Sequence, residues 1–387
     1  MEPQSLPPSE AAAWVVDRQA DAPSPEAGPH TDVVVRVEAE LVACMAERRL
    51  VDLDVAPGGV APADALTAFV LRGGSRLRAR CVWWGWLAGG GPDAGEASRS
   101  PVGLAVALEL LQASALVHDD VMDGSRTRRG GPALHVLFST AHRRAGWCGD
   151  AAAYGTAQAV LAGDLALMWA EDVFRSVPLD VPVRRRADRT WRSMLAEMVA
   201  GQHLDLRLQA EGSECPEAAL RTAELKTALY SVARPLELGA VAAGAADDVT
   251  RILHEYGRRI GLAFQLRDDL LGVYGDPTKT GKPSGDDIRS GKRTYLTAVA
   301  LRLARKAASP EAENRIRATL GDPLASGTAL RAFRELLVQL GAVQAVEARI
   351  SALADEAVAL LGDEALAPES ALPLERLARR VAKGTVT

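Results

Sequence analysis

The sequence predicts an all-α protein, and three observations support this fold class. Ala and Leu dominate the apolar residues, which make up 48% of the chain, whereas aromatic residues make up only 4%. Ala and Leu are good helix formers, while strands favour aromatic and β-branched residues. Apolar residues also recur with helical spacing, and no alternating strand pattern of useful length occurs. We therefore expect a bundle of about ten or more helices.

The chain is expected to form one long helical domain after a short extension. Residues 1–30 are rich in Pro, Ala, Ser and acidic residues and show no lasting period, which is typical of disorder. Residues 31–387 carry one continuous series of helical patterns, although 387 residues is long for one domain. There is no basic region followed by an apolar core, and no run of about 18 apolar residues, so we expect neither a secretory signal nor a membrane span.

Turn and loop signals divide residues 31–387 into helices. The helical period begins at Thr31, resumes through Leu66 after a Pro/Gly loop, and starts again at Leu77. A Gly/Pro-rich break then precedes a strongly apolar helix over residues 102–123. Further helices are expected over residues 151–174, 185–209, 216–230, 235–245 and 249–273 and from 294 to the end, with a glycine-punctuated loop at 275–291.

Charge and cysteine usage exclude other classes of protein. The formal net charge is −5 and no basic arm or stripe occurs, so nothing favours a nucleic-acid partner. The four cysteines are scattered without paired spacing, which is typical of reduced thiols rather than of a disulfide framework or a zinc site. These features predict a cytoplasmic protein.

An acidic cluster ends the apolar helix at residues 102–123. Asp119 and Asp123 are four residues apart and project from one helical face, where like charges repel each other. A cation between them would relieve the repulsion, and Mg²⁺ typically takes one or two carboxylates together with phosphate oxygens and water. Arg128 and Arg129 follow nearby, and guanidinium groups suit diphosphate oxygens. The alternative is an acidic helix end that its own arginines neutralise.

A second acidic pair, much later in the chain, argues against that alternative. Asp268 and Asp269 follow an apolar helical stretch, where solvated surface charge is not expected. Beyond them, the glycine-punctuated loop carries Lys282 and Lys292 and can close over an anion. Its glycine spacing differs from that of a P-loop, and no strand precedes it. The two acidic clusters and the basic loop predict a helical enzyme that holds a diphosphate through magnesium.

Five separated motifs occur together in the chain. They are Gly73-Gly74-Ser75-Arg76-Leu77-Arg78, Asp119-Asp120-Val121-Met122-Asp123 with Arg128-Arg129-Gly130, Gly163-Asp164, Gly201-Gln202-His203-Leu204-Asp205 with Lys226-Thr227, and Asp268-Asp269 with Lys282 and Lys292. In this order they closely resemble the trans-isoprenyl diphosphate synthases, the polyprenyl synthetase family, and bacterial geranylgeranyl diphosphate synthases in particular. The resemblance implies an isoprenoid synthase helical bundle around a central active-site cavity, and a homodimer.

The resemblance also implies a reaction, namely head-to-tail condensation of isopentenyl diphosphate with an allylic diphosphate. Three Mg²⁺ ions would be held by Asp119, Asp123 and Asp268, with Asp120 and Asp269 in supporting roles. The allylic diphosphate would contact Arg128, Lys226, Lys282 and Lys292. Isopentenyl diphosphate would contact Arg78, Gln112 and Arg129, while Thr227, Tyr230 and Gln265 would border the reaction centre.

Two positions depart from the family pattern. The first motif usually carries Lys where this chain has Ser75, which predicts weaker binding of isopentenyl diphosphate. The second acidic motif often ends in a third aspartate, and that position is Gly272 here. These departures lend some support to a non-catalytic subunit of a partner synthase, which the intact aspartates oppose.

Small residues near the expected tunnel floor indicate the product length. In the resembled family, the residues four and five positions before the first aspartate lie near the floor, and here they are Ala115 and Ser114. Bulky aromatic residues there usually stop the product at farnesyl length, so small ones indicate geranylgeranyl diphosphate (C20), with Leu111 as the next stop. Farnesyl diphosphate synthase is the nearest alternative.

A class I terpene cyclase and a helical scaffold are more distant alternatives. A cyclase shares an acidic motif and Mg²⁺ but needs no second diphosphate site, so Arg78 and Arg129 weigh against it. A scaffold leaves the two acidic clusters unexplained.

Overall fold

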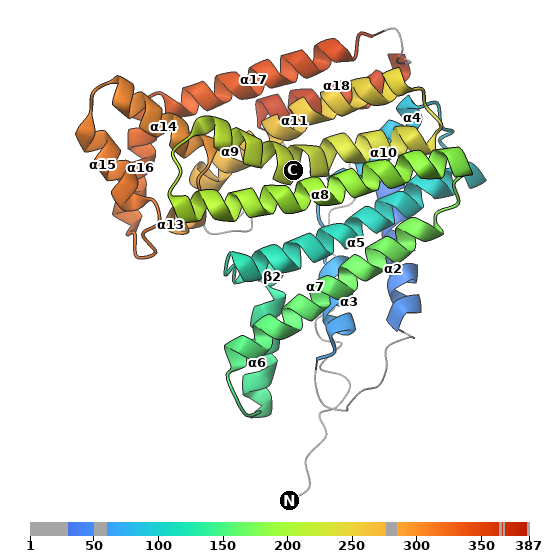
Figure 1. Ribbon diagram of the computed structural model, residues 1–387, viewed down its shortest axis with the longest axis horizontal. Coiled ribbons are helices and arrows are strands. Elements are labelled where there is room, and N and C mark those ends of the chain that lie inside the picture. Colours follow the sequence, from blue (N-terminus) through green and yellow to red (C-terminus); the bar gives the residue numbers. More distant parts are fainter. Residues whose placement is uncertain (1–29, 50–59, 276–284, 364–365, 367, 385–387) are drawn as a thin grey trace, which may run out of the picture.

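The protein is described here from a computed structural model, and Figure 1 shows its helices coloured along the chain. The structure describes residues 30–49, 60–275, 285–363, 366 and 368–384. The predicted extension therefore lies outside the described residues except for its last residue, His30, which begins the first helix. Over the described residues the fold is all-α apart from one small hairpin, as the sequence predicts.

The elements of the first half are α2 (His30–Arg49), α3 (Pro62–Leu71), α4 (Leu77–Ala88), the 3₁₀ helix η1 (Glu96–Ser98), α5 (Arg99–Met122), β1 (Thr127–Arg128), β2 (Gly131–Pro132), α6 (Leu134–Ala145), α7 (Ala151–Ser176) and α8 (Val181–Glu211). Those of the second half are α9 (Pro216–Ala223), the π-helix η2 (Glu224–Ala233), α10 (Arg234–Ala242), α11 (Asp247–Tyr274), α13 (Asp286–Arg289), α14 (Tyr295–Lys306), α15 (Pro310–Thr319), α16 (Gly327–Gln339), α17 (Ala342–Leu360) and α18 (Pro368–Lys383).

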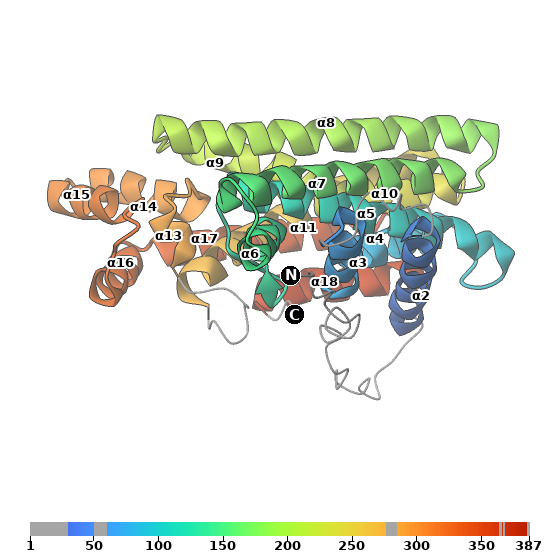
Figure 2. The same cartoon turned by 90° about the horizontal axis from the view of Figure 1, so that it is seen from below.

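The long helices lie side by side and enclose the core. Helix α5 packs against α7 and α4, and α11 packs against η2 and α17. Helix α8 packs on η2 and runs along one outer face of the molecule (Figure 2). The short helices α14, α15 and α16 gather at one end of the long ones (Figures 1 and 2). This arrangement brings the ends of α5 and α11 beside η2, where the acidic and basic side chains meet.

Helix α5 is the apolar centre of the bundle. Among the described residues, one helix, Glu96–Met122, is long and apolar enough to cross a membrane, and a second would qualify only if the bent pair α16 and α17 formed one span. The expectation that no such run exists was therefore wrong as to length and composition. However, 78% of the apolar window of this helix is buried inside the protein, which is typical of a core helix.

Glycines allow α4 and α10 to approach each other closely. A Cβ atom on Gly85 would lie 2.0 Å from the carbonyl oxygen of Leu236, and one on Gly239 would lie 1.9 Å from that of Val82. Both distances are far below van der Waals contact, so neither glycine can carry a side chain without moving a backbone. Each helix thus contributes one glycine to the contact.

Three local features differ from the sequence-based expectation. Helix α6 was not predicted, although Leu134, Phe138 and His142 recur at intervals of four and are all buried. The hairpin of β1 and β2 was also not predicted, because its strands have only two residues each. The break expected between residues 230 and 235 is absent, since α9, η2 and α10 follow one another without a gap.

The hairpin turn and the π-helix both have unusual backbone geometry. Arg129 and Gly130 form the turn with φ of 51° and 70°, the left-handed values that a tight two-residue hairpin turn requires. The π-helix η2 spans ten residues, whereas π geometry is usually confined to a single turn and is frequent at functional sites. Both elements carry side chains of the site described next.

Candidate active site

The last turns of α5 carry carboxylates that meet cations from other elements. Asp120 is 1% exposed and accepts a 2.8 Å hydrogen bond from Nε of Arg128, which lies in strand β1 of the hairpin. Asp119 accepts a 3.0 Å hydrogen bond from Nζ of Lys226 on η2. The same Nζ donates to Asp205 of α8 at 2.7 Å. Three separate elements are thus joined to the end of α5 by charge.

The pKa values of Asp119 and Asp123 are shifted in opposite directions. Burial alone would raise the pKa of Asp119, but Lys226, Lys292 and Arg128 outweigh it, and the pKa falls below its ordinary value. Burial raises the pKa of Asp123, and repulsion from Asp119 raises it further. The two carboxylates therefore resist being ionised together without additional positive charge.

The second acidic pair lies near the C-terminal end of α11. Asp268 is exposed, whereas Asp269 accepts a 2.7 Å hydrogen bond from Nε2 of Gln265. The Oε1 atom of Gln265 in turn accepts a 2.6 Å hydrogen bond from the hydroxyl of Thr227. Burial raises the pKa of Asp269 to about 8, and repulsion from Asp268 adds to the effect. The chain Thr227–Gln265–Asp269 links η2 to the second acidic cluster.

Lys292 connects the two acidic clusters. Its Nζ lies 3.5 Å from Asp123 and 3.5 Å from Asp287, and its charge also acts on Asp269. Burial would lower the pKa of Lys292, but the surrounding carboxylates outweigh burial and raise it. The second predicted lysine of this loop, Lys282, lies outside the described residues.

The donor set fits a magnesium–diphosphate unit better than a magnesium ion alone. Among the residues that the structure describes, no three His, Cys, Asp or Glu side chains form a ready-made metal site. Each cluster instead offers one or two carboxylates, which matches the habit of Mg²⁺ to fill its shell with phosphate oxygens and water. The raised pKa of Asp123 and of Asp269 shows where added positive charge would be favourable. Asp119, Asp123 and Asp268 are the residues that would hold the magnesium of such a unit.

Arg78 forms part of a different, carboxylate-poor environment. Its guanidinium donates a 2.6 Å hydrogen bond to the hydroxyl of Ser231 and lies 4.5 Å from the ring centroid of Tyr230. Among the described residues, Arg78 forms no ion pair with a carboxylate. It therefore keeps its charge available for an anion from outside the chain.

Arg129 belongs to the same environment and comes from the hairpin turn. It donates a 3.1 Å hydrogen bond to the carbonyl oxygen of Phe69 and lies 5.1 Å from the centroid of that ring. Its guanidinium is also close to Gly74 of the loop that contains the exposed Ser75. Burial, helped by neighbouring arginines such as Arg76, lowers its pKa to about 10. A nearby anion would stabilise the positive charge of Arg129.

Gln112 lies on α5 about one turn after Glu109, the residue that contacts the loop at residues 73–76. The amide oxygen of Gln112 is buried and has no hydrogen-bond partner among the described residues. Arg76 forms a 2.5 Å ion pair with Glu109 of α5, and both side chains are buried. This pair fixes the loop onto α5, and it was not predicted because Arg76 and Glu109 are far apart in the sequence.

The residues expected to limit product length lie about one to two turns before Asp119 on α5. Leu111 is fully buried, Ser114 is 3% exposed, and Ala115 is half-buried. Their placement along α5 follows from its helical period.

Asp205, Asp287 and His118 also belong to the surroundings, although no role was predicted for them. His118 precedes the acidic cluster, and its Nε2 lies 3.4 Å from a carboxylate oxygen of Asp164. A Cβ atom on Gly163 would lie 2.2 Å from the same Nε2, so the Gly-Asp motif makes room for the imidazole ring. The recurring motifs flagged Asp164 and Asp205, but only the fold reveals their partners.

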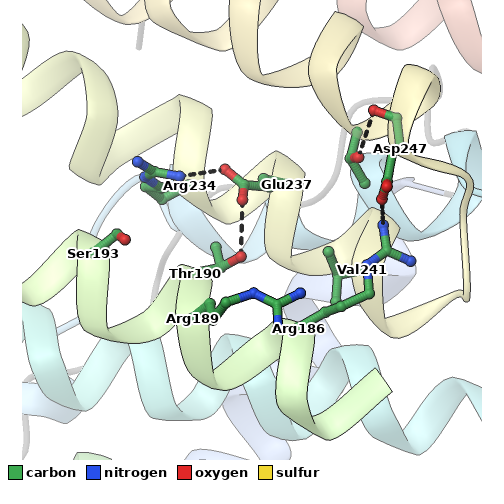
Figure 3. A pocket seen from close by; sticks show the side chains of 9 residues that line it. Arg186, Arg189, Thr190, Ser193, Arg234, Glu237, Val241 and Asp247 are labelled. Carbon is green, nitrogen blue, oxygen red and sulfur yellow. Dashed lines mark hydrogen bonds and ion pairs between the residues drawn. The ribbon is translucent and has the colours of Figure 1, made fainter. Parts of the chain in front are cut away.

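A separate pocket of about 180 Å³ lies elsewhere, between α8, α10 and α11 (Figure 3). It is lined by Arg186, Arg189, Thr190, Ser193, Arg234, Glu237, Val241, Asp247 and Thr250. Thr190 and Asp205 are fifteen residues apart on α8, which corresponds to about 22 Å along a helix. The pocket is therefore not part of the site at the end of α5.

The fold and the site together define a helical bundle of the isoprenoid synthase type. The profile of the polyprenyl synthetase family matches residues 62–335. The structure is similar to that of geranylgeranyl pyrophosphate synthase from Corynebacterium glutamicum in complex with isoprenyl diphosphate and magnesium, with a TM-score of 0.84 and 41% identity over 90% of this chain and 97% of that one. The chain belongs to the polyprenyl synthetase family.

Curated relatives with two different products are similarly close in sequence. A (2E,6E)-farnesyl diphosphate synthase from Mycobacterium tuberculosis is 38% identical over 52% of this chain. A geranylgeranyl diphosphate synthase from the same organism is 35% identical over 61% of this chain. The matches span 51% and 61% of the length of these two relatives. Identity alone therefore does not separate the two product lengths.

Proposed function

We propose that this protein condenses isopentenyl diphosphate with an allylic diphosphate, head to tail, to give a short-chain prenyl diphosphate. The observation that carries the proposal is the presence of two cationic environments of different character. One surrounds Asp119, Asp123 and Asp269 with Lys226 and Lys292. The other contains Arg78 and Arg129, for which the described residues provide no carboxylate ion pair. The first suits a diphosphate held with a metal, and the second suits a diphosphate held by cations alone.

This difference also favours a synthase over the alternatives. A terpene cyclase binds one diphosphate and has no use for the arrangement of Arg78 and Arg129. A non-catalytic subunit needs neither the Thr227–Gln265–Asp269 chain nor the lysine that bridges both clusters. We therefore retain these alternatives only as outcomes of the experiment below.

The side chains suit the loss of a diphosphate leaving group. Departure of the group leaves an allylic cation, and its cost falls when preorganised charge stabilises the departing diphosphate. Lys226, Lys292 and Arg128 would provide that charge, and bound magnesium would add Lewis-acid stabilisation of the same oxygens. Thr227 and Gln265 would border the reacting atoms. No side chain needs to act as a nucleophile, because the double bond of isopentenyl diphosphate attacks the allylic cation. The departing diphosphate can then take the proton whose loss completes the reaction.

The product is proposed to be geranylgeranyl diphosphate, with farnesyl diphosphate as the alternative. Ser114 and Ala115 have small side chains, whereas Leu111 presents a bulkier side chain one turn deeper. The similar identities to a farnesyl and a geranylgeranyl synthase leave the choice to experiment.

The test is to incubate the protein with Mg²⁺, isopentenyl diphosphate and, separately, dimethylallyl, geranyl and farnesyl diphosphates. The dephosphorylated products are then identified by mass. A C20 alcohol supports the full proposal, while a C15 endpoint keeps the reaction and moves the tunnel floor to another residue. No elongation with any primer would favour the cyclase or the non-catalytic subunit.

We further propose a cytoplasmic homodimer that joins through the face formed by α7 and α8. Both helices lie toward the viewer in Figure 1 and along the upper edge in Figure 2. Large apolar side chains are exposed on these two helices, namely Val160 (39%), Leu161 (56%) and Met168 (60%) of α7 and Val199 (63%) of α8. Such a concentration of exposed apolar residues is typical of an interface. The free cysteines and the net charge of −5 agree with a reducing compartment and no nucleic-acid partner.

A further inference from the structure

The short helix α13 returns the chain to the end of α11. The amide of Gly285 donates a 3.2 Å hydrogen bond to the carbonyl oxygen of Gly272. Ile288 is 1% exposed, and its carbonyl oxygen accepts a 2.8 Å hydrogen bond from the amide of Gly321. The segment that carries Asp287 is thus fixed at both sides of that residue.

The carboxylate of Asp287 occupies the space that a side chain at position 272 would use. A Cβ atom on Gly272 would lie 2.3 Å from Oδ2 of Asp287, a distance that real Cβ contacts do not show. Positions 268 and 272 are four apart and share one face of α11. Any residue larger than glycine at 272 would therefore displace Asp287 from this position beside the second acidic cluster.

Asp287 in turn holds Lys292. One oxygen of Asp287 faces Gly272, while the other lies 3.5 Å from Nζ of Lys292. The same Nζ lies 3.5 Å from Asp123. Lys292 thus lies between Asp287 of its own segment and Asp123 of α5. Without Asp287, the flexible side chain of Lys292 would be free to move away from Asp123.

We propose that Asp287 is a positioning residue that directs Lys292 to the allylic diphosphate, and that Gly272 is the residue that makes its position possible. The inference rests on the proposed function of this site. The proposal gives a physical reason for Gly272, which stands where the family often has an aspartate. The glycine leaves space for the carboxylate of Asp287 from another segment. Asp287 itself is not assigned a contact with either substrate.

The test compares Asp287→Ala with Asp286→Ala, its neighbour in sequence. Asp286 has the same charge, is 54% exposed and faces Arg289 instead of the site. We expect Asp287→Ala to weaken the Mg²⁺-dependent binding of inorganic pyrophosphate about tenfold in calorimetry, as for other residues that orient a ligand-binding group. The Michaelis constant should rise for the allylic diphosphate but not for isopentenyl diphosphate. Asp286→Ala should leave all three within about twofold.

Gly272→Ala adds a second, independent arm to the experiment. Its methyl group should displace Asp287 and reproduce the loss seen in Asp287→Ala. In the double variant the two effects should not add, because both act through the same contact. Equal behaviour of the Asp287 and Asp286 variants, or additive effects in the double variant, would overturn the proposal.

Two controls keep the outcome interpretable. Circular dichroism identifies any variant that fails to fold, and in that case Asp287→Asn, which keeps the size of the side chain, must show the same loss for the proposal to stand. Pyrophosphate binding requires no turnover. If the unmodified protein forms no prenyl product, the proposed function fails, while the calorimetric comparison still decides the role of Asp287.

Discussion

Ser75 departs from the family pattern in the environment proposed to bind isopentenyl diphosphate. It is exposed in the loop at residues 73–76, close to the guanidinium of Arg129. We expect Ser75→Lys to lower the Michaelis constant for isopentenyl diphosphate about ten- to a hundredfold, since one charge-assisted contact contributes about 1.5–3 kcal/mol. Steady-state kinetics at a fixed concentration of allylic substrate measure this change. Ser75→Met provides similar length without charge, and an equal effect from it would show that charge is not the cause.

Ser114 is expected to control product length. The residue is 3% exposed on α5, one turn before the acidic cluster. We expect Ser114→Phe to shift the product toward C15, because the ring would fill the space of the last isoprene unit. The product spectrum by mass spectrometry measures the shift, and Ser114→Ala, which keeps the space open, should leave the spectrum as it is. A spectrum that does not move in the Phe variant would place the tunnel floor elsewhere.

Glu237 lies in a charged network beside the pocket of Figure 3. Burial alone would raise its pKa, but His254, Arg234 and Thr190 outweigh burial and lower it. A carboxylate with a lowered pKa stabilises the fold above its unfolded pKa of about 4.3, and this stabilisation is lost as pH falls through the folded value. We expect Glu237→Gln to reduce the free energy of unfolding at pH 7 by about 1.5–3 kcal/mol, and by less in acid.

Urea denaturation of the Glu237 variant at pH 7 and at about pH 3.5 measures this difference. Asp247→Asn is a matched control, because Asp247 borders the same pocket and pairs with Arg186 but is 97% exposed. Its replacement should have little effect at either pH. A difference for Glu237→Gln that stays constant between the two pH values would contradict the assignment.

At the residue scale, the sequence identified the carriers of charge but not their partners. Asp119 and Asp123 stand out because carboxylates rarely occur in an apolar helix. The partnership of Lys226 with Asp205 joins two helices that the sequence cannot place side by side. Glu109 was overlooked for the same reason, since its partner Arg76 lies in a distant loop.

At the element scale, the contact between α4 and α10 depends on its two glycines. We expect Gly239→Ala to reduce the free energy of unfolding by about 1–3 kcal/mol, because the added methyl group would overlap the carbonyl oxygen of Val82. Gly327→Ala is the control. A Cβ atom at Gly327 meets nothing within 4 Å, so this change should be neutral or stabilise by up to about 1 kcal/mol. Equal destabilisation by the two variants in thermal or urea unfolding would show that the close contact is not the cause.

Long elements were predictable from the sequence, and short or irregular ones were not. Helices such as α5 and α11 have enough turns for their apolar period to be recognised. The hairpin of β1 and β2 is too short for any period, although the Arg129-Gly130 turn gives it a defined geometry. The π geometry of η2 leaves no signal in composition, so a break was expected at Pro235 where the helix in fact continues.

At the scale of the whole molecule, the exposed apolar residues of α7 and α8 form the proposed dimer interface. We expect the protein to be a dimer and Met168→Glu to shift it to monomer at the same concentration, because a buried unpaired charge is costly at an interface. Analytical ultracentrifugation measures the molar mass. Leu324→Glu is the control, since Leu324 is 88% exposed outside that face. A monomeric parent protein, or dissociation caused equally by both variants, would contradict the proposed interface.

The π-helix η2 determines how α9 and α10 are rotated relative to each other, because the three elements form one continuous helical segment. Lys226 and Thr227 lie within it and point to the site, while Gly239, a few turns later on α10, must face α4. Each residue of an α-helix adds a rotation of about 100° about the helix axis. Removing one residue from η2 would therefore rotate α10 relative to α9 by an angle of about this size. Either the lysine or the glycine would then face the wrong way. The length of this segment is therefore under stricter constraint than the identity of most of its side chains.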